Sequence, residues 1–474
     1  MIEVFRLRRA IVLATVLFLP VSAAMHAQTA ATWTVQPEWV KAHEEFLSSD
    51  DMKGRGSATP DEKRAADYVA SKFEGYGLQH APGMNSYIQS AEVHEPEFDG
   101  HATLNIGGTR FHEGTDFTIL MASGENVSER LVHVPLTGNS TLHQTRGSVL
   151  IGTEKPANMS SGQVASYLRR AGGAMVVVEE DPSTSAMLTM FGGKTRVPMS
   201  LAGASGSGRG GPTVIVVKHD SMSKFENAAE GAVVSLDLHP VKNLPKRETY
   251  NAVGYLPGSD PHAGTLLLTA HLDHLGVGRP VNGDSIYNGA NDDAAGTTAV
   301  MELAHALGAG PKPRRSVLFV CYGSEEAGEL GSTYFGEHPP VPLKELIANL
   351  EFEMIGNQDP KMPKNTLLLT GWERSNLGPT LKEHGALLGP DPYPEQHFFE
   401  RSDNYALALK GVVAHTAAGW GDPPTYHQPD DDMQHLDLPF MTAAIQSLIE
   451  PVRWLASSDF KPEWNKGGQP KPRQ

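Results

Sequence analysis

The feature that most constrains the fold is an apolar, β-prone run that ends in two adjacent glutamates. Residues 317–322 (V-L-F-V-C-Y) are predicted to form a buried strand, and Glu325 and Glu326 follow it in the turn G-S-E-E-A-G. A second predicted strand, residues 266–270, leads directly into H-L-D-H. Because the carboxyl ends of neighbouring parallel strands form the edge where α/β sheets bind ligands, this pattern favours metal-dependent hydrolysis.

Predicted strands and helices alternate from residue 249 to about residue 454. Strands are expected at 265–270, 316–322, 349–355, 366–370 and 411–416, with helices starting near Asp293, Val341, Asn376 and Pro439. Two further helices are expected near residues 37–49 and 61–76. The alternation predicts an α/β domain with a mostly parallel central sheet flanked by helices.

The chain is too long for one ordinary domain, and its middle part differs in character. Residues 116–244 contain short β runs and a Gly/Ser-rich stretch, which predicts an inserted β-rich domain. The α/β domain is then discontinuous, formed by residues 28–115 and 245–456. Residues 457–474 are rich in Lys, Pro and Gly, and we expect them to be disordered.

Residues 1–27 have the pattern of a secretory signal peptide. Arg6, Arg8 and Arg9 precede an apolar run over residues 10–19, and small residues follow as far as Ala27. No other apolar stretch approaches the ~18 residues expected of a membrane-spanning helix. The protein is therefore expected to be exported, to the periplasm or the medium, with no membrane contact after cleavage.

Net charge limits the possible binding partners, and the cysteine content limits the possible disulfides. The net charge of -16 argues against nucleic acid or an anionic membrane. Cys321 is the single cysteine, so no internal disulfide can form, and its place in a predicted strand favours an inert thiol. The oligomeric state cannot be read from the sequence.

Imidazole and carboxylate groups recur at the predicted strand ends, as a pair of divalent cations would need. The candidate ligands are His271, Asp292, Glu325 or Glu326, Glu353 and His427. Asp292 precedes a helix and could bridge two cations, and Asp273 shares the side of His271 and could accept its second N–H. We expect His274 to face away and be structural, and Asp293 to stabilise the helix start. Two imidazoles favour zinc over calcium.

Five motifs resemble, in order and spacing, those of the co-catalytic zinc exopeptidases, a family that includes bacterial leucyl-type aminopeptidases and glutamate carboxypeptidase. They are H-L-D-H-L-G, N-G-A-N-D-D-A-A-G, E-E-A-G-E-L-G-S, E-F-E-M-I-G and Y-H-Q-P-D-D-D. The 116–244 insertion resembles a protease-associated domain through R-G-S-V-L-I-G and A-G-G-A-M-V-V-V. Together the resemblance covers nearly all of the mature chain.

The resemblance implies two Zn²⁺ ions per chain. One would be held by His271, Asp292 and Glu353, and the other by Asp292, Glu326 and His427. It further implies that Glu325 is the general base for a metal-bridged hydroxide, and that Tyr426 stabilises the oxyanion. The sequence departs from the family at two positions, since Glu353 stands where Asp is usual and Asn404 stands where His is common.

The function that this resemblance favours is an exported aminopeptidase acting on peptides. A glutamate-releasing carboxypeptidase would need cationic residues for the terminal carboxylate. Arg374 and Arg401 are near the motifs but in no recognisable carboxylate-binding pattern. Two further functions stay open, that of a glutaminyl cyclase, which is an acyltransferase, and that of a non-catalytic binding homologue. A substrate pocket is expected from the loops at 370–374, 397–399 and 417–420.

Overall fold

The computed structural model describes residues 33–137, 145, 147–190, 195, 197–203 and 211–471. The predicted leader, residues 1–27, lies outside this part of the chain. The described strands form a nine-stranded sheet, an eight-stranded sheet and a hairpin of β13 (Gly276–Val281) and β14 (Asp284–Tyr287).

The nine-stranded sheet has the order β18-β17-β19-β16-β12-β15-β11-β1-β8. Its members are β1 (Ile88–His94), β8 (Ser200–Leu201), β11 (Arg247–Leu256), β12 (Thr265–His271), β15 (Ser316–Tyr322), β16 (Leu346–Glu353), β17 (Leu367–Leu369), β18 (Leu388–Pro390) and β19 (Ala414–Ala418). The four neighbours β19, β16, β12 and β15 are parallel, whereas β11 and β1 add antiparallel pairs at one side. The predicted α/β fold with a mostly parallel centre is confirmed.

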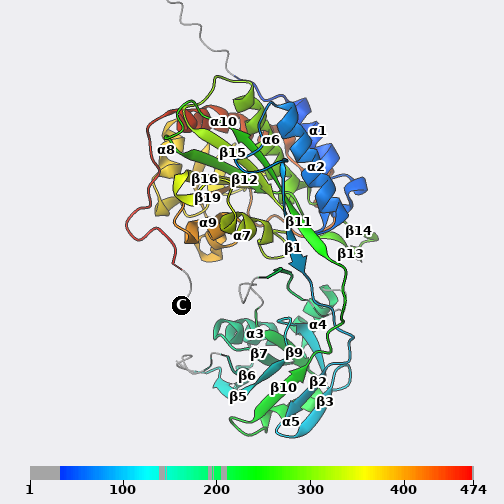
Figure 1. Ribbon diagram of the computed structural model, residues 1–474. Helices are drawn as coiled ribbons and strands as arrows, with labels where there is room; N and C mark the ends of the chain where they lie inside the picture. The colour runs from blue at the N-terminus through cyan, green and yellow to red at the C-terminus, as the bar shows by residue number, and fades with distance from the viewer. Residues whose placement is uncertain are drawn as a thin grey trace, which may run out of the picture. The chain divides into compact units, whose positions relative to one another are not determined.

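Helices cover both faces of this sheet (Figure 1), so every residue of β12 and β15 is buried. This double cover explains why these strands read as continuous apolar runs rather than alternating ones. The first face carries α1 (Pro37–Leu47), α2 (Pro60–Gly75), α6 (Ala295–Gly308) and α10 (Leu438–Ser457), with α8 (Leu377–Glu383) packed on α10, and the other face carries α7 (Leu330–Glu337) and α9 (Asn404–Leu409). Cys321 is buried in β15, and burial raises the pKa of its thiol, which fits an inert role.

Two expectations about this domain were wrong. The helix predicted near Val341 is only a 3-10 turn, Leu343–Glu345, because prolines 339, 340 and 342 interrupt the backbone donors there. The segment after residue 457, expected to be disordered, is described through residue 471 and bonds to the α/β domain. Trp464 donates its indole N–H to the carbonyl of Gly411 and packs with the core that contains Phe399, so one aromatic side chain anchors this otherwise polar segment.

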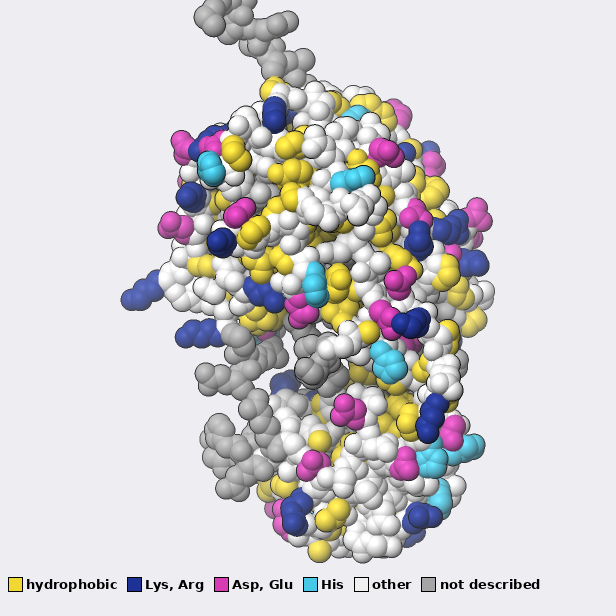
Figure 2. Space-filling model, viewed as in Figure 1, with side chains coloured by type: hydrophobic (Ala, Val, Ile, Leu, Met, Phe, Trp, Pro, Cys, Tyr) yellow, Lys and Arg dark blue, Asp and Glu magenta, His cyan; other side chains and the backbone are white. Residues whose placement is uncertain are grey.

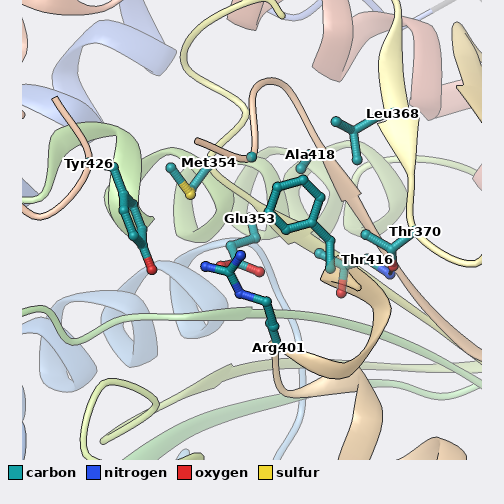
Figure 3. A pocket seen from close by; sticks show the side chains of 10 residues that line it. Glu353, Met354, Leu368, Thr370, Arg401, Thr416, Ala418 and Tyr426 are labelled. Carbon is teal, nitrogen blue, oxygen red and sulfur yellow. Dashed lines mark hydrogen bonds between the residues drawn. The ribbon is translucent and has the colours of Figure 1, made fainter. Parts of the chain in front are cut away.

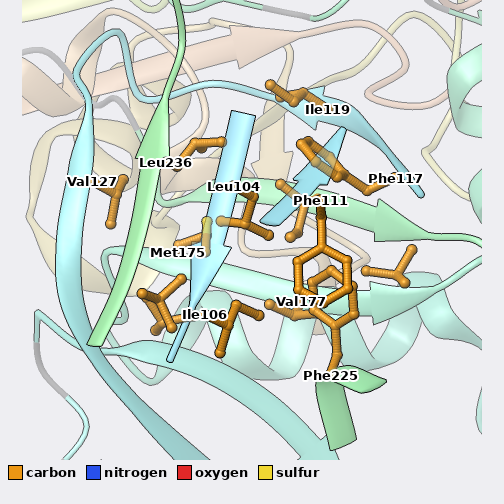
Figure 4. Packing of buried hydrophobic residues seen from close by; sticks show 14 of the residues in the cluster. Leu104, Ile106, Phe111, Phe117, Ile119, Val127, Met175, Val177, Phe225 and Leu236 are labelled. Carbon is orange, nitrogen blue, oxygen red and sulfur yellow. The ribbon is translucent and has the colours of Figure 1, made fainter. Parts of the chain in front are cut away.

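The eight-stranded sheet has the order β3-β2-β10-β5-β6-β7-β9-β4 and a core of its own. Its strands are β2 (Thr103–Ile106), β3 (Thr109–His112), β4 (Phe117–Met121), β5 (Val127–Pro135), β6 (Val149–Thr153), β7 (Met175–Glu179), β9 (Thr213–Val217) and β10 (Val233–Asp237), with helices α3 (Ser161–Arg170), α4 (Pro182–Met190) and α5 (His219–Glu226). Phe111, Phe117 and Phe225 lie together in its core with aliphatic side chains from several strands (Figure 4). The sheet includes β2 and β3, which precede residue 116.

Acidic and basic side chains are interspersed on the face of the molecule seen in Figure 2. Such mixing differs from the continuous basic stripe of a nucleic-acid-binding surface. Among the described helices, none combines the length and the apolar character needed to cross a bilayer.

Candidate metal centre

The carboxyl ends of three adjacent parallel strands bring the candidate ligands to one edge of the sheet. His271, the last residue of β12, pairs in register with Tyr322, the last residue of β15, and Glu326 lies in the turn that follows. Glu353 is the last residue of β16, on the other side of β12. The topology therefore places residues far apart in the chain side by side, as the strand-end argument predicts.

One group of potential ligands consists of His271, Asp292 and Glu353. One ligand atom from each lies within 4.8 Å of the others. Nε2 of His271 is 3.2 Å from Oδ1 of Asp292, and both side chains are buried. One imidazole and two carboxylates form a donor set that suits a divalent cation.

A second group forms around the other oxygen of Asp292. Nε2 of His427 lies 3.2 Å from Oδ2 of Asp292 and 3.3 Å from Oε1 of Glu326. Asp292 thus faces each group with a different oxygen, which is the arrangement of a bridging carboxylate. His274 also reaches this group, because its Nδ1 lies 2.8 Å from Oε1 of Glu326. The expectation that His274 faces away was wrong.

The chemistry of the donor atoms fits a pair of cations. Nε2 of His271 and Oε1 of Glu326 are buried and have no hydrogen-bond partner among the described residues. Buried polar atoms without partners are costly, so their convergence at this edge needs an explanation. A cation bound in each group would satisfy them and balance the surrounding carboxylates.

Asp273 positions the loop that carries the paired glutamates. Its Oδ1 accepts the backbone N–H of Glu325 at 2.9 Å, and its Oδ2 accepts the hydroxyl of Ser57 at 2.6 Å. The expected hydrogen bond to His271 is not formed by the carboxylate, whose Oδ1 is 3.8 Å from Nδ1 of the imidazole. The backbone carbonyl of Asp273 lies nearer, at 3.3 Å, and can accept that N–H.

Glu325 lies beside both groups. Burial raises the pKa of Glu325 well above its ordinary value, the charge of His271 opposes this rise, and neighbouring carboxylates, including Asp403, Glu326 and Glu353, reinforce it. A carboxyl whose pKa is raised by its surroundings is suited to hold a proton between steps of a reaction.

Three further residues hold the ligand-bearing backbone, a role that was not assigned to them from the sequence. Asp293 accepts the N–H groups of Gly296 and Met354 with one oxygen and lies 3.3 Å from the N–H of His271 with the other. The prediction that Asp293 stabilises the start of the helix therefore describes only part of what this residue does. Asp431 accepts the N–H groups of Asn291 and Asp292. The run of three aspartates after His427 was the available signal for Asp431.

Arg55 is the third such residue, and its guanidinium is fully buried. It donates to the carbonyls of Leu272, Asn288 and Gly289, and also to that of Leu47. The carbonyl of Leu272 belongs to the residue after His271, and the carbonyls of Asn288 and Gly289 lie shortly before Asp292. The guanidinium of Arg55 therefore fixes two loops that supply ligands.

A pocket opens beside the first group, and Figure 3 shows its lining. Glu353 lies in its middle, between Tyr426 on one side and Thr370 on the other, with Arg401 at its edge. The ring of Tyr426 stacks on that of His427 with 3.9 Å between centroids, and burial raises the pKa of its hydroxyl. The lining is Glu353, Met354, Leu368, Thr370, Phe398, Arg401, Thr416, Ala418, Gly421 and Tyr426.

The three loops expected to form this pocket each contribute to it, through Thr370, Phe398 and Ala418. Phe399, the neighbour of Phe398, packs in the core. Arg374 donates to the carbonyl of Gly468 and lies over the ring of Phe399, so its guanidinium serves the C-terminal segment. Arg401 is the one arginine in the pocket lining.

Comparisons with known proteins find aminopeptidases among the relatives of this chain. The aminopeptidase YwaD of Bacillus subtilis is 24% identical over 366 residues, which are 76% of this chain and 75% of that protein. An aminopeptidase of Pseudomonas aeruginosa is 27% identical over 66% of this chain, although the match spans only 56% of that protein.

Solved structures show the same fold. The aminopeptidase from Aneurinibacillus sp. strain AM-1 is similar with a TM-score of 0.55 and 17% identity, over 89% of this chain and 94% of that one. A zinc aminopeptidase from Bacillus subtilis gives a TM-score of 0.51 at 17% identity, over 90% of this chain and 96% of that one. Residues 251–450, which contain every candidate ligand, match the model of peptidase family M28. This match covers the part of the chain that forms the metal centre, and together with the aminopeptidases among the relatives it supports a zinc exopeptidase family.

Proposed function

We propose that this protein is an exported, zinc-dependent aminopeptidase that removes N-terminal residues from peptides. One observation carries the proposal: the carboxylate of Asp292 turns one oxygen toward each of two ligand groups, and each group has its own imidazole. The match of residues 251–450 to peptidase family M28 and the aminopeptidases among the relatives support the same reaction. Zinc is the cation that the mixed imidazole and carboxylate ligands favour.

In this proposal His271, Asp292 and Glu353 would hold one zinc, and Asp292, Glu326 and His427 would hold the other. Two bound cations would supply polarisation of the scissile carbonyl and a lower pKa for the attacking water. Glu325 would take the proton from the water and later give it to the leaving amine. Tyr426, whose ring faces the pocket beside Glu353, donates its hydroxyl to the developing oxyanion.

The charges at the site favour a substrate with a free α-amine. Carboxylates crowd the metal centre, and the charges of Asp292, Glu326, Glu353 and Glu325 all act on the hydroxyl of Tyr426. A protonated amine is attracted to such a surface, whereas a terminal carboxylate would be repelled unless Arg401 received it. Arg401 is therefore the one observation that favours a carboxypeptidase.

A substrate panel tests the reaction. Purified protein would be assayed on aminoacyl anilides, N-blocked dipeptides and peptides with N-terminal glutamine, before and after chelation. We expect release only from free-amine substrates, loss of release on chelation, and recovery with zinc. Release only from blocked dipeptides would instead establish a carboxypeptidase. Cyclisation of N-terminal glutamine would establish a glutaminyl cyclase, and the absence of any turnover would indicate a binding protein.

We further propose export through the leader over residues 1–27 and a protease-associated character for residues 116–244. The family match begins only at residue 251, after the insertion, and the insertion contributes to a sheet with its own core. Amino-terminal sequencing of protein from the periplasm or medium would show a start after residue 23, 24 or 27. Limited proteolysis of the native protein should cut in the two connections to the eight-stranded sheet, between β1 and β2 and near residue 244, and cuts spread evenly over the chain would contradict a separate unit.

A further inference from the structure

His274 is a fully buried histidine at the edge of the second ligand group. Its Nδ1 lies 2.8 Å from Oε1 of Glu326 and 3.8 Å from Oδ2 of Asp292. Its ring meets that of His427 edge to face, with 5.6 Å between centroids. The imidazole thus stands beside the same two carboxylate oxygens that His427 approaches.

The contact with Glu326 is close but is not an aligned hydrogen bond. Neither ring nitrogen of His274 has a hydrogen-bond partner among the described residues, and neither does Oε1 of Glu326. Nε2 of His271, the candidate ligand in the first group, is in the same condition. Nitrogen and oxygen atoms that converge without bonding to one another are arranged as ligands around a shared cation.

We propose that Nδ1 of His274 is an additional ligand of the cation held by Asp292, Glu326 and His427. This inference rests on the two-cation site of the proposed function. It makes the two halves of the site unequal. The second cation would have two imidazoles and two carboxylates, whereas the first would have one imidazole and two carboxylates.

The surrounding chain holds the His274 ring in this position. The backbone N–H of His274 is 3.2 Å from the carbonyl of Arg55, whose guanidinium donates to the carbonyl of Gly289. A Cβ atom at Gly289 would lie 2.5 Å from Cγ of His274, and Gly289 has a φ of +60°. Only glycine leaves room for the ring there, so the backbone of Gly289 packs directly against the imidazole.

Unequal ligand sets predict unequal affinities for zinc. Imidazole is a good zinc ligand, so the half with two imidazoles should fill first. Removing His274 should weaken only that half, whereas removing Glu353 should weaken only the other. Metal binding reports this without any substrate, so failure of the aminopeptidase assay would leave the inference intact.

The direct test is X-ray absorption of the zinc-loaded wild-type protein, which counts imidazoles around the metal. Three imidazoles shared by the two cations would support the proposal. Two would overturn it, and would leave His274 as a neighbour that merely orients Glu326. This measurement needs no variant and therefore does not depend on how a substituted protein folds.

Zinc titration against a chromophoric chelator gives an independent readout. In H274Q we expect the affinity of one zinc equivalent to fall at least about tenfold, with the other unchanged. H338Q is the matched control, because His338 is exposed and outside the centre. Circular dichroism of the metal-free proteins would verify folding, and H274A would replace H274Q if the latter were unfolded. Wild-type affinity for both equivalents in a folded variant would contradict the proposal.

Discussion

The carboxylate of Asp273 accepts the backbone N–H of Glu325 at 2.9 Å. Its other oxygen lies 3.4 Å from the backbone N–H of Glu326, so one side chain anchors the turn that supplies both the proposed base and a proposed ligand. Asp273 is buried, and it reaches this turn from the loop after β12. Correct placement of Glu325 therefore depends on a residue that need not touch substrate.

We expect D273N to lower kcat because an amide can turn an N–H, rather than an oxygen, toward the backbone donors of Glu325 and Glu326. A loss of about 10–100-fold is typical when a group that orients a metal site is removed. Steady-state kinetics would measure it, and S57A serves as a control, since it removes only the hydroxyl that Asp273 accepts. If D273N matched the wild type in kcat, the turn would not depend on Asp273.

E325Q should retain both zinc ions and lose most of its activity. The amide keeps the shape of Glu325 but cannot take a proton, and removing a general base typically costs about 10²–10⁴-fold in rate. Metal analysis and kinetics would be done on the same preparation. The matched variant E326Q changes the neighbouring proposed ligand and should instead lose zinc. Loss of zinc from E325Q with retention by E326Q would reverse the two assignments.

The parallel strands, and the convergence of the candidate ligands at the strand ends, could be predicted from the sequence because both leave local patterns. His274 was misplaced because the two-residue alternation of side chains was extended past the strand. β12 ends at His271, and beyond it the chain turns, so alternation no longer says where a side chain points.

Asp431 and Arg55 were missed for a different reason. Their side chains bond backbone atoms of loops that are distant in sequence, and such long-range contacts leave no periodic pattern. α7 was missed because the sequence around the paired glutamates was interpreted as a loop, although the chain becomes helical directly after Glu329. Tertiary contacts decided each of these cases.

Arg401 should tune the preference for the substrate side chain. It is exposed at the pocket edge, its guanidinium lies over the ring of Phe398 at 5.0 Å, and no ion pair to it is formed within the described residues. We expect R401A to lower kcat/KM by about tenfold for peptides with a side-chain carboxylate that reaches the pocket. Uncharged aminoacyl anilides should be unaffected.

R401K is the control for Arg401, because it retains the positive charge but not the planar donor pair. It should keep part of the preference. Equal losses on charged and uncharged substrates in R401A would show that the residue supports the pocket rather than selecting the substrate.

His415 should make stability depend on pH. It is buried in β19, its Nδ1 donates to the carbonyl of Thr370 and its Nε2 accepts from Ser375, and burial lowers the pKa of its imidazole to about 4. The unfolded chain takes up this proton near pH 6.5, whereas the folded protein does so only near pH 4. The contribution of neutral His415 to the free energy of unfolding is therefore fully present above pH 6.5 and is lost as the pH falls toward 4.

The expected size is a fall in the free energy of unfolding of up to about 1.4 kcal/mol per pH unit within that window. Chemical denaturation of the metal-free protein at several pH values would measure it, since removing zinc separates this effect from acid release of the metal. H415Q should flatten the dependence, whereas H384Q, at an exposed histidine, should not. Parallel curves for H415Q and the wild type would mean that His415 is not the group responsible.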